Sequence, residues 1–160
     1  MPQTQLKSRI DAVREHGILR DLDPHFVEKL AGIALEAQFR PDQIVFREGD
    51  HSDFFYLVIS GTIALEMIAN GHAVRVQTLH EGDAMGWSAL LAGDGKHFQA
   101  RATSHVRALA FEGTRVREEF DLDPAFGYAM TKRLLRTVVE RLDATRVQLA
   151  EAFGKAGLSA

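Results

Sequence analysis

The chain has 160 residues, of which about 46% are hydrophobic and 26% charged, a balance typical of one folded domain with its own core. The formal net charge is −3, whereas chains that bind DNA through general electrostatics are usually basic. The absence of cysteine excludes disulfides, thiolate metal sites and a cysteine nucleophile. No stretch has the composition of a signal peptide or the roughly 20 apolar residues of a membrane span. We therefore expect a cytoplasmic protein without a membrane segment.

The N-terminal part of the chain favours helices. Residues Leu6 to His16 form an amphipathic pattern, and Gly17 closes it. Asp23-Pro24 then starts a second helix, because Asp is a good N-cap and Pro suits the first helical position. Its apolar face is supplied by Phe26, Val27, Leu30 and Ile33. We place these helices within residues 5–35.

The middle of the chain, residues 37–111, favours short strands. Apolar and polar residues alternate over 43–46, 55–59, 62–67 and 74–79, and a second pair follows at 98–103 and 106–111. Turn signals separate these runs, and the clearest is Asn70-Gly71, which is typical of a tight hairpin. Many short strands with regular turns indicate a sandwich or a small barrel.

The C-terminal part returns to helix after Gly113, and we place these helices within residues 113–155. Asp123-Pro124 repeats the Asp-cap, Pro-first arrangement. Spacings of three and four then define one continuous apolar seam: Phe126, Met130, Leu134, Val138, Leu142, Leu149 and Phe153, with Thr145 in register. Leu135 and Val139 widen it, and Gly154 and Gly157 end it. A small β-domain covers only part of such a helix, so we expect a homodimer through this seam.

The order of these elements, together with the glycine motifs, resembles the cyclic-nucleotide-binding domain of the catabolite-activator and anaerobic-regulator superfamily. The matching residues are Phe46-Arg47-Glu48-Gly49-Asp50, Tyr56-Leu57-Val58-Ile59-Ser60-Gly61, Gly82-Asp83 and Gly86. The resemblance covers about Ile18 to Phe153. It implies a mainly β fold with flanking helices, in which a double-stranded β-roll (jelly-roll-like) is followed by a long C-terminal helix. We expect one domain over residues 1–160.

The family's ligand site is a phosphate-binding cassette that starts at the glycine equivalent to Gly86. The family pattern continues with a glutamate for the ribose and an arginine for the cyclic phosphate. Here Trp87 replaces the glutamate, and His97 stands at the arginine position when Ala102 is aligned with the alanine that follows. Arg101 and Lys96 are alternative partners for an anion. Gly-Trp-Ser followed by His-Phe-x-Ala-Arg-Ala is similar to a bacterial subgroup of single-domain members without a helix-turn-helix part.

On the long helix, the stretch from Arg141 to Arg146 resembles the family segment that reaches the base. Thr145 takes the family's threonine position, and Arg146 replaces a serine. The residues expected to contact a ligand are Gly86, Trp87, Ser88, Ala89, His97, Phe98, Arg101, Thr145 and Arg146.

Two of these residues have competing interpretations. Trp87 is either a stacking platform for a purine base or a plug that fills the vacated pocket. Arg101 is either the partner of the phosphate or a strand residue in a cross-strand salt bridge.

We therefore expect a regulatory, non-enzymatic ligand-sensing module that binds a cyclic nucleotide or another small anion, needs no cofactor, and passes its signal through the C-terminal helix to a protein partner. The alternative is a ligand-free dimerisation or adaptor module whose pocket is closed by Trp87. A cupin-type metalloenzyme has less support, because the seven histidines include no His-x-His pair. The sequence ends a few residues after Phe153, so we expect neither a helix-turn-helix nor DNA binding.

Overall fold

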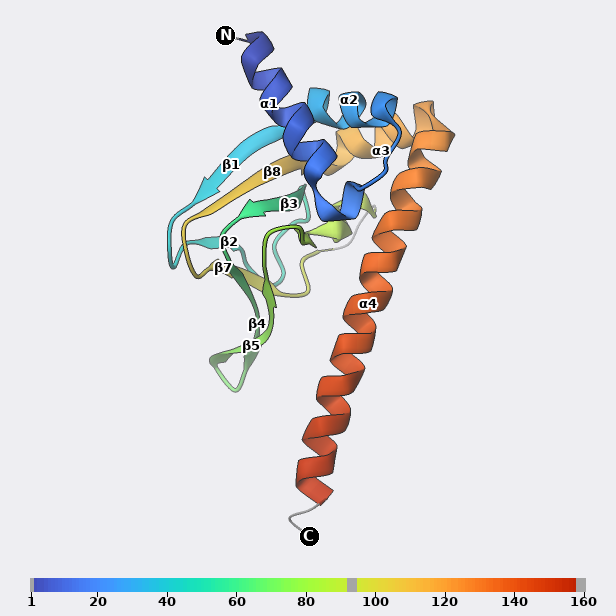
Figure 1. Cartoon of the computed structure of the whole chain (residues 1–160). Coiled ribbons are helices and arrows are strands. Elements are labelled where there is room, and N and C mark those ends of the chain that lie inside the picture. Colours follow the sequence, from blue (N-terminus) through green and yellow to red (C-terminus); the bar gives the residue numbers. More distant parts are fainter. Residues whose placement is uncertain (1, 92–94, 158–160) are drawn as a thin grey trace.

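The computed structural model describes residues 2–91 and 95–157, which form two N-terminal helices, a β-roll and two C-terminal helices (Figure 1). The helical elements before the roll are α1 (Pro2–Glu15), the short 3₁₀ helix η1 (Gly17–Leu19) and α2 (Pro24–Ile33). The strands are β1 (Leu35–Phe39), β2 (Ile44–Phe46), β3 (Phe54–Ser60), β4 (Ile63–Ala69), β5 (His72–Leu79), β6 (Ala84–Met85), β7 (Gln99–Ala102) and β8 (Val106–Glu112). A second 3₁₀ helix, η2 (Trp87–Leu90), precedes β7, and α3 (Gly113–Leu122) and α4 (Pro124–Gly157) follow β8.

The strands form two antiparallel four-stranded sheets, ordered β1-β8-β3-β6 and β2-β7-β4-β5 in the described part of the chain. Non-consecutive strands are neighbours in both sheets, as a rolled-up β-domain requires. The mainly β prediction with flanking helices is therefore confirmed. The strand region begins at Leu35, earlier than predicted, because the edge strand β1 pairs with β8 from Leu35 opposite Ala110.

Two hydrophobic clusters hold this arrangement together. One lies inside the roll and contains Val58, Ile63 and Leu79 together with Ala100 and Ala102 of β7. The other joins the β1-β8-β3-β6 sheet to the helices. Because side chains alternate along a strand, the inward alanines of β7 direct Gln99 and Arg101 to the outer face of their sheet.

The turn and cap signals of the sequence have the predicted geometry. Asp23 accepts a hydrogen bond from the His25 N–H at the start of α2. Asp123 does the same for Phe126 at the start of α4, over 3.2 Å. Asn70 and Gly71 have φ values of 51° and 77°, the left-handed conformation of a tight hairpin turn.

The junction between α3 and α4 is tied to α2 by Lys29. Its ammonium lies 3.4 Å from the Glu119 carboxylate and 3.2 Å from that of Asp123, and both pairs are half-buried. The link ties the start of α4 to α2.

α4 is packed at one end and exposed at the other. Phe126, Met130 and Leu134 are buried against the rest of the domain. Beyond them the helix runs past the roll and ends away from it (Figure 1). Of the two glycines predicted to end the seam, Gly154 lies within α4 and Gly157 is its last residue, two positions beyond the predicted bound of 155. No described helix has the length and apolar character needed to cross a membrane.

Candidate ligand site

The cassette begins where β6 passes into η2 at Gly86. This residue has φ = +76°, and a Cβ at this position would lie 2.6 Å from the Phe54 carbonyl oxygen and 2.8 Å from the Lys96 ammonium. Only glycine combines that conformation with such close neighbours. The turn presents Trp87 on η2 beside Lys96.

Behind this turn is a small cavity of about 50 Å³. Its walls include the apolar side chains of Phe46, Leu65, Met85, Trp87 and Phe98, and two cations, Lys96 and Arg141, also line it. Drug-sized ligands usually occupy sites of about 300–1,000 Å³. In this conformation the volume of the cavity lies well below that range.

Lys96 is the deepest polar group at the cavity, with 5% of its surface exposed. Its ammonium donates to the Phe54 carbonyl over 3.1 Å and to the Gly86 carbonyl over 3.4 Å. It also lies 4.7 Å from the centre of the Phe46 ring. Burial lowers the pKa of Lys96 to about 8, against a weaker opposing effect of the Asp53 carboxylate. At neutral pH the site therefore holds a largely protonated lysine whose charged form is destabilised by burial.

Arg141 closes the cavity from α4. Its guanidinium carbon lies 4.1 Å from the centre of the Trp87 ring, and Nη2 donates to the Ala84 carbonyl over 2.8 Å. A guanidinium over an indole face is a favourable cation–π arrangement. Burial lowers the pKa of Arg141 to about 10, and the Asp83 carboxylate acts weakly in the opposite direction. This contact joins the long helix directly to the cassette.

The other predicted cassette residues differ in their contacts and in their exposure. The Ser88 hydroxyl is hydrogen-bonded to that of Ser52, and Ala89 is fully buried where η2 meets α3. The Arg117 guanidinium donates to the Ala89 carbonyl. His97 and Phe98 both line the cavity, but His97 is exposed whereas Phe98 is half-buried.

The structure does not bring every predicted site residue to the cavity. Arg101 lies on the outer face of its sheet, where its Nε donates to the Glu66 carboxylate over 3.0 Å. This is the cross-strand salt bridge of the second interpretation. Thr145 is exposed and donates to the Arg141 carbonyl, while Arg146 forms an exposed ion pair with Asp143 at 3.4 Å.

Sequence reasoning missed Arg141, although a signal for it existed. Arg141 follows the buried Leu134 by seven residues, two turns of helix, and therefore lies on nearly the same face of α4. The family comparison had drawn attention to Thr145 and Arg146 instead.

A wider hollow of about 710 Å³ lies at the β1–β2 turn, among Gln38 to Gln43 and His105. It is lined almost entirely by exposed side chains and contains no buried polar group that could orient a ligand. Among the residues that the structure describes, no group of three or more histidine, aspartate or glutamate side chains is placed to hold a metal ion.

Comparison with known proteins places these features in context. Residues 36–123 match the family model described as the cyclic nucleotide-binding domain. A cAMP-dependent protein kinase regulatory subunit of Dictyostelium discoideum is 29% identical over 97 residues, which is 57% of this chain but only 30% of that protein.

Solved structures share the fold at low identity. A cyclic nucleotide-binding domain from Methylobacillus flagellatus superimposes with a TM-score of 0.80 at 15% identity, over 93% of this chain and 84% of that one. The regulatory subunit of a cAMP-independent protein kinase A from Trypanosoma brucei gives 0.71 at 20% identity, over 84% of this chain and 46% of that one.

Proposed function

Because this chain belongs to the cyclic nucleotide-binding domain family, we propose that it is a ligand-sensing regulatory module with an altered cassette that signals through α4. The observation that carries the proposal is the Arg141–Trp87 contact, in which the long helix supplies one wall of the cassette cavity. A ligand that enters this cavity must act on both elements at once.

An anionic ligand is supported by the charges at the cavity. Lys96 and Arg141 are both desolvated, and neither forms an ion pair with a carboxylate of the described residues. Asp53 and Asp83 act on them only from a distance. An anion in the cavity that both side chains line would supply a counter-charge.

The proposed output is a change in how α4 lies against the roll. After Leu134, α4 is largely exposed, and Arg141 reaches back to η2 and β6. A ligand that draws Arg141 off Trp87 would bias the helix between two arrangements. The effector would be a protein partner.

The exposed half of α4 also supports the proposed homodimer. Leu135, Val139, Leu142, Leu149 and Phe153 are between 46% and 70% exposed. With Arg146 included, their spacing alternates between four and three, the repeat of a coiled-coil seam. This seam differs from the predicted one, because Phe126, Met130 and Leu134 face the rest of the domain.

A second candidate is the ligand-free dimerisation or adaptor module. The observation that favours it is the small volume of the cavity, about 50 Å³, with Trp87 and Arg141 against each other at its edge. In that case the cassette would be a permanently closed structural joint.

A thermal-shift titration separates the two candidates. The panel is cyclic AMP, cyclic GMP, cyclic di-GMP, phosphate and sulfate at low millimolar concentration, where general salt effects are small. A ligand at one hundred times its Kd should stabilise the fold by about 2.7 kcal/mol, a shift of a few degrees in Tm. The sensing module predicts such a shift for at least one ligand and its loss in Lys96→Met. No shift with any of the five would favour the adaptor.

A further inference from the structure

We infer that the cavity between Trp87, Lys96 and Arg141 binds a small free oxyanion of about four or five non-hydrogen atoms, rather than a cyclic nucleotide. The inference rests on the proposed function, because it names the ligand of the same sensing site.

The size of the cavity is the first argument. One water molecule needs roughly 10–15 Å³ of such space. The cavity of about 50 Å³ is therefore larger than a single water needs, but well below the roughly 300–1,000 Å³ of sites for drug-sized ligands. Nitrate, bicarbonate, phosphate and sulfate are closer to the size of this cavity than a purine, a ribose and a phosphate together.

The chemistry of the walls is the second argument. Lys96 is 5% exposed, and its ammonium is held by carbonyl oxygens, which satisfy hydrogen bonds but carry no net charge. Arg141 uses Nη2 for the Ala84 carbonyl and offers further N–H groups in a planar fork suited to oxyanions. The remaining walls are mostly apolar, so an anion there would meet little competing negative charge.

The residues that shape the cavity also oppose a nucleotide. A ribose would have to pass Trp87, which stands beside the glycine turn and is covered by Arg141 at 4.1 Å. A Cβ at Gly86 would lie 2.6 Å from the Phe54 carbonyl oxygen and 2.8 Å from the Lys96 ammonium, so this turn is packed closely against both residues. A small anion would need no movement of this turn, and only the Arg141 guanidinium would have to shift toward it.

Isothermal titration calorimetry of the full chain tests the inference. Sodium nitrate, bicarbonate, phosphate and sulfate are titrated separately at pH 7, and cyclic AMP and cyclic GMP are titrated in parallel. We expect saturable binding of at least one oxyanion, and a loss of affinity of about tenfold or more in Lys96→Met and in Arg141→Met, because each removes a charged hydrogen-bond donor. Lys7→Met and Arg136→Met are the controls, since both side chains are exposed and lie outside the cavity.

A second measurement needs no variant. Since burial lowers the pKa of Lys96 to about 8, oxyanion affinity in the wild-type protein should fall as the pH rises above 8 and the ammonium is lost. The charged groups that act on the two cations are the carboxylate of Asp53, which acts on Lys96, and that of Asp83, which acts on Arg141.

The possible outcomes distinguish a failure of the inference from a failure of the proposed function. Lys96-dependent binding of a cyclic nucleotide with no oxyanion binding would overturn the inference and leave the sensing module standing. If the oxyanion affinity is unchanged in Lys96→Met and does not vary between pH 7 and 9.5, the ligand is an adventitious ion only. This result would also overturn the inference. The absence of binding by all six ligands would overturn both the inference and the proposed function.

Discussion

At the scale of single residues, the cassette keeps a buried positive charge that works against stability. The folded-state pKa of Lys96 is about 8, below the usual 10.5 of an exposed lysine. Between these two pH values the unfolded chain therefore binds more protons than the folded one. By linkage, the free energy of unfolding must rise with pH across that window, and the penalty is fully present below pH 8.

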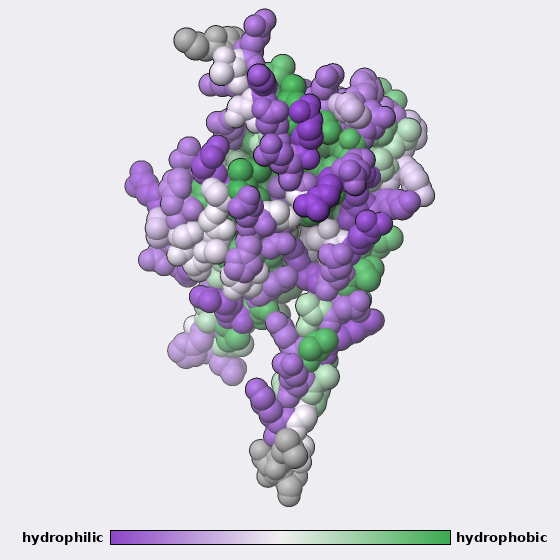
Figure 2. Space-filling view, viewed as in Figure 1, coloured by the Kyte–Doolittle hydropathy of each residue, from purple (hydrophilic) through white to green (hydrophobic). Residues whose placement is uncertain are grey.

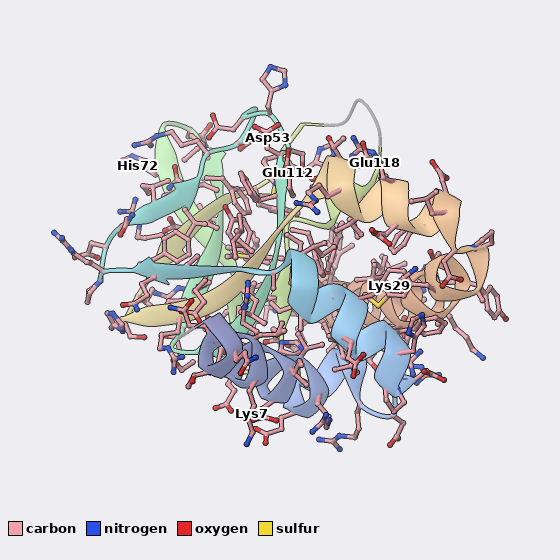
Figure 3. All side chains as sticks on the ribbon, turned by 90° about the horizontal axis from the view of Figure 1, so that it is seen from above. Lys7, Lys29, Asp53, His72, Glu112 and Glu118 are labelled. Carbon is pink, nitrogen blue, oxygen red and sulfur yellow. The ribbon has the colours of Figure 1, made fainter. Side chains whose placement is uncertain are left out.

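Replacing Lys96 with methionine should remove this pH dependence. Methionine nearly keeps the length of the side chain but removes its charge. Between pH 8 and 10.5, the free energy of unfolding of the wild type should therefore rise relative to that of Lys96→Met by roughly 1–3 kcal/mol. Urea unfolding at several pH values measures the difference. The control is Lys7→Met, since Lys7 lies exposed on the outer side of α1 (Figure 3). Parallel stability curves for wild type and Lys96→Met would contradict the burial of a charged Lys96.

At the scale of elements, α4 consists of two parts with different surroundings. Its first part buries Phe126 and Met130 in the core shared with α2 and α3. Its second part carries apolar side chains that the roll does not cover, and hydrophobic residues mark this part of the surface in Figure 2. An exposed apolar stripe of this length is typical of a helix that pairs with another.

Charges placed on this stripe should dissociate the proposed dimer without unfolding the domain. We expect Leu142→Glu combined with Leu149→Glu to be monomeric at a concentration where the wild type is dimeric, because like charges would face each other across the seam. Light scattering after size exclusion measures the mass. Gln148→Glu, exposed on the same helix, adds a charge outside the seam and should remain dimeric. A wild-type monomer, or a dimer that survives both substitutions, would contradict the assignment.

Much of the fold at this scale could be predicted from sequence because its signals are local. Asp23-Pro24, Asp123-Pro124 and Asn70-Gly71 each act through their own backbone conformation, and the structure has all three. Strand β1 was missed because none of its five residues is fully buried and their alternation is weak, and β6 was missed because it has only two residues. Their pairing with β8 and β3 is decided by distant residues.

The candidate site was only partly predictable, for a related reason. Gly86 and Trp87 could be identified because the cassette is contiguous in sequence, and Lys96 was one of three cations left open. Choosing among them needs burial, since Lys96 is 5% exposed while Arg101 pairs with Glu66 on the outer face. Arg141 comes from an element about fifty residues away, and only the packing angle of α4 brings it to Trp87.

At the scale of the whole molecule, the cassette and the long helix share a contact that the proposed ligand would disturb. Arg141 belongs to α4, Trp87 to η2, and Lys96 to the segment before β7. Their meeting point connects the roll, which would sense the ligand, with the helix, which would present the seam to a partner (Figure 1). Binding and dimer geometry would then be linked, so that a ligand favouring one helix arrangement also favours one dimer.

The measurement that tests this account most directly is the fluorescence of Trp87, the only tryptophan in the chain. Emission is recorded while phosphate, sulfate, bicarbonate or cyclic AMP is added to the wild type and to Lys96→Met. We predict a saturable change in the emission of the wild type with at least one of these anions, since the ligand draws Arg141 off the indole ring, and no such change in Lys96→Met. Emission that stays constant with every anion, or that changes equally in both proteins, would contradict an anion-responsive cassette closed by α4.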